Sequence, residues 1–188
     1  MTRFVPFATS LTLLALATAA PPVQAEDFTV SSPSFSAATP LPERHMLDSF
    51  GCHGQNLSPA LRWDHPPAGT RSFAVTLYDP DAPTGSGWWH WVVVDISADQ
   101  RALPEGAGNA GRPGLPAGAL QGRTDFGAPG YGGACPPEGA PPHRYVLTVH
   151  ALKVERLGVP PDASPAMMGY MIHMNRLGSA VVQTTYGR

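Results

Sequence analysis

The first of two groups of side chains that could do chemistry lies in the segment 79–91. Asp79-Pro80-Asp81-Ala82-Pro83 follows an apolar run directly, and Trp88-Trp89-His90-Trp91 opens the next one. Proline fixes φ and has no backbone donor, so the two carboxylates lie in a stiff turn. A hairpin between the runs would bring His90 near Asp79 or Asp81, where a carboxylate holds an imidazole's tautomer and raises its pKa. Taken alone, the segment also fits an ordinary Asx-type turn and a packed histidine.

A second group of polar side chains follows far downstream. The loop Gly132-Gly133-Ala134-Cys135-Pro136-Pro137 precedes His143-Arg144-Tyr145, which opens another apolar run. Alternation along a strand sends His143 and Tyr145 to one face and Arg144 to the other. We expect Arg144 to form a structural ion pair, with Asp81 as one candidate partner. Imidazoles, a phenol and carboxylates held by prolines suit a small polar or anionic ligand.

Other chemistries find less support in the sequence. Gly85-Ser86-Gly87 is a loop rather than a nucleophile elbow, and no phosphate-binding glycine motif is present. A metal site of His90, His143 and a carboxylate stays open, although no HxH or HExxH spacing concentrates the ligands. We predict neither a metal nor a cofactor. The remaining histidines are predicted to be surface or packing residues: His45, His53, His65, His150 and His173.

Residues 1–25 have the pattern of a secretory signal peptide. Arg3 supplies a positive start, residues 11–20 are mostly apolar, and Val23-Gln24-Ala25 suits a signal peptidase. A membrane-anchoring helix is the alternative, but the run is short and Pro21-Pro22 ends it. Cleavage would leave 163 of the 188 residues and change the net charge from −2 to −3. We therefore expect a single domain over 26–188 in a periplasmic or secreted protein.

The charge pattern argues against two classes of partner. Lys153 is the sole lysine, and no basic stripe of the kind that binds nucleic acid is present. A basic amphipathic helix for membrane attachment is also missing from the sequence. The 20 glycines and 22 prolines are spread among apolar segments, which indicates a loop-rich globular domain.

The two cysteines, Cys52 and Cys135, both lie in Gly-rich loops beside the polar clusters. Export would permit a disulfide between them, and we favour that pairing. Two reduced, partly buried thiols remain the alternative, because sequence does not supply the geometry. Metal binding is less favoured, since neither cysteine has a CxxC-type partner.

Period-two hydrophobicity predicts a mainly antiparallel β-sandwich. Segment 72–77 alternates, and 91–96 is nearly all apolar, as in a strand covered on both faces. The other predicted strands are 144–152, 28–31, 60–63 and 180–186. One C-terminal helix is predicted from the N-cap Ser164 to a C-cap at Gly178. The Gly- and Pro-rich connector 98–142 should be functional or lid-forming, with short helical turns.

These motifs together resemble the phosphatidylethanolamine-binding protein (PEBP) family. The resemblance rests on Asp79-Pro80-Asp81-Ala82-Pro83, the tryptophan-histidine after it, and Gly133…Pro136-Pro137…His143-Arg144-Tyr145. Thr84–Val92 and Asn56-Leu57-Ser58-Pro59 are similar to the bacterial YbhB/YbcL-type branch, named Raf kinase inhibitor-like. The leader and the cysteines look most like the exported YbcL type. The resemblance covers about Phe28 to Tyr186.

The resemblance implies a β-sandwich with a small anion pocket that binds phosphate or a phosphoryl headgroup. It implies binding without firmly attached catalysis. The implied ligand-binding residues are Asp79, Asp81, Pro83, His90, Gly133, Pro136, His143 and Tyr145. Because two carboxylates repel phosphate, binding should strengthen as pH falls and the histidines become charged.

Two other functions remain open. An inhibitor or effector could act through protein contacts, and a weak hydrolase could use His90 or His143 as a base. Kinase regulation, known among eukaryotic members, does not transfer to an exported chain. The resemblance also leaves a homodimer open, but the sequence shows no exposed apolar stripe that argues for one.

Overall fold

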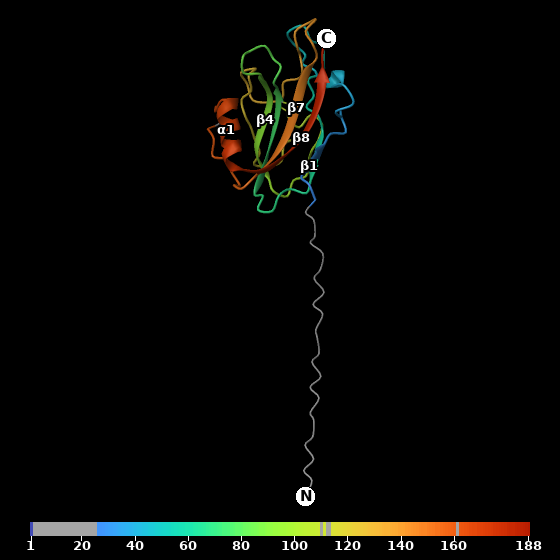
Figure 1. Cartoon of the computed structure of the whole chain (residues 1–188). Coiled ribbons are helices and arrows are strands. Elements are labelled where there is room, and N and C mark those ends of the chain that lie inside the picture. Colours follow the sequence, from blue (N-terminus) through green and yellow to red (C-terminus); the bar gives the residue numbers. More distant parts are fainter. Residues whose placement is uncertain (2–25, 110, 112–113, 161) are drawn as a thin grey trace.

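A five-stranded antiparallel sheet forms the centre of the molecule, and a three-stranded sheet packs against one of its faces (Figure 1). The computed structural model describes residues 1, 26–109, 111, 114–160 and 162–188. The predicted signal peptide falls on residues 2–25, outside the described residues. The large sheet runs in the order β6 (Leu120–Gln121), β4 (Trp88–Ser97), β3 (Ser72–Asp79), β7 (His143–Leu152) and β8 (Arg176–Tyr186). The small sheet contains β1 (Thr29–Ser31), β2 (Leu61–Asp64) and β5 (Ala102–Leu103).

Two apolar clusters cover the two faces of the large sheet. Phe73, Val75 and Trp91 pack against Trp63 of the small sheet. On the other face, alternate residues of the same strands pack against helix α1 (Pro165–Asn175) through Met168 and Ile172. Strand β4 is therefore buried on both faces, as its continuous apolar run predicts. The predicted antiparallel sandwich with one C-terminal helix is confirmed.

The C-terminal helix begins as predicted but ends earlier. The Ser164 side chain accepts a hydrogen bond from the Met167 N–H at 3.2 Å, which makes it an N-cap. The helix ends at Asn175, and Gly178 is not its C-cap but a residue of β8 that pairs with Ala151. A Cβ at Gly178 would lie 2.8 Å from Pro67 Cγ, so close packing explains this glycine. Strand β8 consequently begins four residues before the predicted start.

The connector 98–142 contains strands where short helical turns were expected. Its described residues form β5 and β6, which add one strand to each sheet, and turns between them. The short 3₁₀ helix of the described chain lies elsewhere, at Glu43–His45. This Gly- and Pro-rich segment is thus held in place by the pairing of β5 with β2 and of β6 with β4.

A β-bulge at His90 breaks the alternation of β4 beside the polar cluster. Leu77 pairs with Trp91 while Tyr78 pairs with Trp89, which leaves His90 as one extra residue. His90 therefore turns to the face that carries Tyr145, with 5.3 Å between the ring centroids. Trp89 packs on the opposite face, toward the helix.

Several large apolar side chains are exposed on α1 and β8, which differs from the expectation that no apolar stripe is exposed. They are Met167, Tyr170, Met174, Leu177 and Val181. The helix is apolar on its inner and outer faces alike, so the sequence pattern does not separate the two. Within the described residues, no helix is both long and apolar enough to cross a membrane.

A disulfide joins Cys52 to Cys135, as favoured from the sequence. The bond ties the loop that follows the 3₁₀ helix to the loop that precedes β7, and the two half-cystines lie 83 residues apart in sequence. Cys135 Sγ also contacts the carbonyl oxygens of Ser49 and Phe50, each at 3.7 Å. The bridge therefore fixes Phe50 relative to residues 135–137.

Replacing both cysteines by serine should lower the free energy of unfolding by about 2–4 kcal/mol, because the cross-link restricts the unfolded chain. Urea unfolding of the wild type and of the Cys52→Ser/Cys135→Ser variant measures this loss. Wild-type protein unfolded in the presence of a thiol reductant is the control and should behave like the variant. Equal urea midpoints for variant and wild type would contradict the prediction.

Candidate functional site

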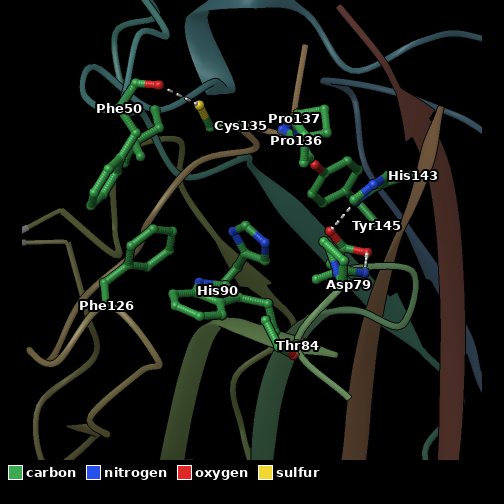
Figure 2. A pocket seen from close by; sticks show the side chains of 14 residues that line it. Phe50, Asp79, Thr84, His90, Phe126, Cys135, Pro136, Pro137, His143 and Tyr145 are labelled. Atoms are coloured by element: carbon green, nitrogen blue, oxygen red, sulfur yellow. Dashed lines mark hydrogen bonds and ion pairs between the residues drawn. The ribbon is translucent and has the colours of Figure 1, made fainter. Parts of the chain in front are cut away.

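A cavity of about 230 Å³ opens at the edge of the large sheet where β3 ends and β4 and β7 begin (Figure 2). These strands are neighbours, so the first cluster and the second cluster of the sequence meet here. The polar side chains that line the cavity are Asp79, Thr84, His90, His143 and Tyr145. Prolines, aromatic rings and the disulfide surround them.

The carboxylate of Asp79 is buried and accepts three hydrogen bonds. Oδ1 accepts from the backbone N–H groups of Asp81 at 2.8 Å and Ala82 at 3.1 Å, which closes an Asx-type turn. Oδ2 accepts from His143 Nδ1 at 2.7 Å. The segment is therefore the Asx-type turn that the sequence also allowed, and the same carboxylate contacts an imidazole. With both oxygens engaged, Asp79 orients His143.

The imidazole paired with Asp79 is that of His143, whereas the hairpin argument had favoured His90. His90 Nδ1 instead donates to the carbonyl oxygen of Gly132 at 2.8 Å. The bulge turns the ring toward the connector and places it beside Phe126, 5.4 Å away between centroids. Burial lowers the pKa of His90, although the Gly132 hydrogen bond opposes the shift.

The hydrogen bonds of the two histidines fix which ring nitrogen carries the proton. A carbonyl or carboxylate oxygen only accepts, so Nδ1 is protonated in both His90 and His143. Nε2 of each ring has no hydrogen-bond partner among the described residues. In a neutral ring this nitrogen accepts a proton donor, and in a charged ring it donates.

Two further donors at the cavity have no acceptor within the described chain. They are the Tyr145 hydroxyl and the indole N–H of Trp88, and both atoms are buried. Burial, and next the negative charge of Asp79, raise the pKa of the Tyr145 phenol, which therefore keeps its proton at neutral pH. A Trp N–H can only donate. Buried donors of this kind need an acceptor.

Asp81 and Gly133 do not line the cavity, which differs from the prediction. Arg144 holds Asp81 outside it through Nε–Oδ2 at 2.9 Å and Nη2–Oδ1 at 2.7 Å. The Arg144 backbone N–H adds a third bond to Oδ2 at 2.8 Å. This confirms the Arg144 ion pair and the alternation of 143–145. A Cβ on Gly133 would clash with the His45 carbonyl oxygen, so this glycine allows close packing of the backbone.

Six of the eight predicted site residues line the cavity: Asp79, Pro83, His90, Pro136, His143 and Tyr145. The sequence prediction missed several others: Leu47, Phe50, Ala82, Thr84, Trp88, Phe126, Cys135 and Pro137. Trp88 and Thr84 lie within the first cluster and could have been found there. Phe50 and Phe126 come from loops whose sequence has no recognisable pattern.

The other histidines with resolved contacts have structural partners. His45 Nδ1 bonds to the Leu57 carbonyl at 2.7 Å, and His65 contacts Glu26 at 2.6 Å. His150 is buried beside Thr76 on the opposite face of the sheet. In the part of the chain that the structure describes, no group of three or more His, Cys, Asp or Glu side chains could hold a metal.

Comparison with known proteins identifies the class. The family model described as phosphatidylethanolamine-binding protein matches residues 31–187. This chain belongs to the phosphatidylethanolamine-binding protein family. It is 56% identical to protein YbhB of Escherichia coli (strain K12) over 146 residues, which are 78% of this chain and 91% of YbhB. It is 50% identical to YbcL of the same strain over 163 residues, 87% of this chain and 89% of YbcL.

Solved structures agree with the family assignment. The crystal structure of Escherichia coli YbcL, described as a member of the mammalian PEBP family, superposes with a TM-score of 0.84 at 48% identity. The match covers 87% of this chain and 99% of that one. A PEBP homologue from Chlamydia trachomatis gives a TM-score of 0.70 at 26% identity, over 86% of this chain and 97% of that one. The YbhB/YbcL-type branch predicted from the motifs is thereby confirmed.

The Asp81–Arg144 pair should stabilise the fold only above acidic pH. The Arg144 side-chain hydrogen bonds hold the pKa of Asp81 at about 2, below its ordinary value of 3.8. Because this folded-state pKa is depressed, the stabilisation is complete above about pH 4 and is lost as pH falls toward about 2. Urea unfolding of wild type and Asp81→Asn should give a small difference in stability at neutral pH, because solvent screens an exposed pair. A difference as large at about pH 2 as at neutral pH would contradict this account.

Proposed function

We propose that this protein is an exported binding protein that holds the phosphoryl group of a small anionic ligand in the cavity between β3, β4 and β7. The observation that carries the proposal is a pair of buried donors, Trp88 Nε1 and Tyr145 Oη, for which the described residues supply no acceptor. Phosphoryl oxygens are strong acceptors and would satisfy both donors. The family is described as phosphatidylethanolamine-binding, which agrees with a phosphoryl ligand.

The two histidines favour a ligand that carries a proton or binds below neutral pH. With Nδ1 protonated, a neutral His90 or His143 offers Nε2 only as an acceptor. A P–O–H group can donate to that nitrogen while the other phosphoryl oxygens accept from Tyr145 and Trp88. When a ring is protonated, Nε2 becomes a donor to the anion. Affinity should therefore rise as pH falls.

Asp79 does not prevent anion binding, although its charge opposes it. Its two oxygens already accept three hydrogen bonds, one of which His143 donates to Oδ2. The carboxylate therefore acts on the ligand mainly by orienting His143. Repulsion of a fully ionised phosphate remains, which again favours the protonated species.

The rim of the cavity suits an organic group attached to the phosphoryl. Phe50 and Phe126 lie next to each other on the side of the cavity away from Asp79 and His143, with 6.5 Å between ring centroids (Figure 2). Pro136 and Pro137 add further apolar surface. A phosphomonoester with a short substituent, such as phosphoethanolamine, would use both the polar base and this rim, whereas inorganic phosphate would use the base alone.

Removing either donor should weaken phosphoryl binding about tenfold or more, because a hydrogen bond to a charged group contributes about 1.5–3 kcal/mol. Calorimetric titration of Trp88→Phe and Tyr145→Phe with phosphoethanolamine measures the loss. Tyr78→Phe is the matched control, since its hydroxyl donates to the Ser86 carbonyl away from the cavity lining. Each titration is repeated at about pH 5.5 and about pH 7.5, on either side of the ordinary histidine pKa.

The wild type should bind more tightly at the lower pH. Inorganic phosphate, titrated in parallel, should bind more weakly than phosphoethanolamine because it leaves the Phe50–Phe126 rim empty. Equal affinity of the donor variants and the Tyr78→Phe control would remove the phosphoryl proposal.

Export is supported by two observations. Residues 1–25 have the charge and hydrophobicity pattern of a signal peptide. The Cys52–Cys135 disulfide is of a kind that persists in oxidising compartments such as the periplasm and is rare in the reducing cytosol. The two features are independent of each other, and both favour a periplasmic or secreted protein.

Expression of the full chain in a bacterial host tests export. We expect the protein in the periplasmic fraction, with a mass that corresponds to a chain beginning at Glu26 and containing one disulfide. A chain of residues 26–188 behind a start methionine is the control and should stay in the cytoplasm. Recovery of the uncleaved full chain from the cytoplasm would rule out the proposed export.

A further inference from the structure

A second cavity, of about 250 Å³, lies on the opposite face of the large sheet beside helix α1. Alternate residues of β3 and β7, Thr76, Thr148 and His150, form its base. Gly169 and His173 of the helix form one wall. This face is apolar where Ala74, Val92 and Val94 meet the helix, so its polar part is the unusual feature.

His150 is the buried polar group that this cavity leaves without a full set of partners. The residue is buried, with only 9% of its surface exposed. Nε2 lies 3.1 Å from Thr76 Oγ1, but the buried Nδ1 has no hydrogen-bond partner in the described chain. A Thr hydroxyl can donate or accept, so Nδ1 can be either the protonated nitrogen or the acceptor. A hydroxyl group, which also plays both roles, would satisfy it in either tautomer.

The ionisable groups at this cavity make it attractive to an anion. Arg176 lines it, and within the described residues its guanidinium has no acidic partner; no acidic residue is among the lining side chains. Burial, and next the charge of Arg176, lower the pKa of His150 to about 4, so that ring is neutral at neutral pH. His173 and Tyr78 are the other titratable groups in the lining.

One permanent positive charge suits a monoanion better than a phosphate dianion. The planar guanidinium of Arg176 matches the two oxygens of a carboxylate. The rings of Tyr78 and Trp89, 4.7 Å apart between centroids, supply an apolar wall for the carbon skeleton. The cavity volume of about 250 Å³ is large enough only for a ligand that is smaller than most drug-sized molecules.

We propose that this cavity binds a small hydroxycarboxylate, with the carboxylate on Arg176 and the hydroxyl hydrogen-bonded to His150 Nδ1. The site is separate from the phosphoryl cavity, with which it shares no lining residue. The proposal therefore does not depend on the proposed function.

Three small probes separate the parts of this proposal: lactate, propionate without the hydroxyl, and lactamide without the charge. Two-dimensional ¹⁵N NMR follows the Gly169 amide and the Trp89 indole during each titration. We expect saturable shifts with lactate, weaker binding of propionate and still weaker binding of lactamide. Arg176→Gln should weaken lactate binding about tenfold or more, because it removes a charge-assisted hydrogen bond. Arg176 is exposed, so the variant should fold.

The phosphoryl-cavity variant Trp88→Phe is the control and should bind lactate as the wild type does. His150→Gln keeps a polar group at the base of the cavity. It should reduce the difference in affinity between lactate and propionate. Three results would overturn the proposal: no saturable shift at Gly169 and Trp89, equal lactate affinity in Arg176→Gln and wild type, or shifts confined to the phosphoryl cavity.

Discussion

The hydrogen bonding of Asp79 is the constraint on which the cavity between β3, β4 and β7 depends. This one carboxylate ends β3, closes the turn through the N–H groups of Asp81 and Ala82, and holds His143 at the start of β7. Residues 79 and 143 are neighbours in space because the pairing of β3 with β7 continues up to Tyr78 and Val146, next to both. The prolines of the turn leave few other conformations to it. Arg144, on the outer face, braces the same turn through Asp81.

The other half of the cavity depends on the connector rather than on strand pairing. The bulge delivers His90 to the cavity face, and the Gly132 carbonyl fixes its ring. Gly133 allows the backbone to pass within packing distance of residues 45–47, and the disulfide then holds the Phe50 loop above the rim. A loop-rich segment is thus rigid where it meets the ligand cavity, because each contact restrains a different part of it.

The features of the fold that depend only on local sequence pattern were predicted. Period-two hydrophobicity gave the strands, and alternation at 143–145 placed Arg144 opposite His143. The sequence pattern did not predict that Asp79 pairs with His143 rather than with His90. One extra residue in β4 reverses which of its side chains share a face of the sheet. The local pattern predicts a helix cap at Gly178, whereas the packing against Pro67 that explains this glycine is a long-range contact. Phe50 and Phe126 reach the rim through loop conformation, which residue types do not encode.

Strand β7 supplies both proposed sites, and its alternation separates them. His143 and Tyr145 point to the cavity that contains a carboxylate, whereas Thr148 and His150 point to the one whose charged lining residue is Arg176. We therefore propose for the first cavity an anion that still carries a proton, and for the second an anion with a single permanent charge. The two proposals differ because a carboxylate lies beside one face of the strand and a guanidinium beside the other.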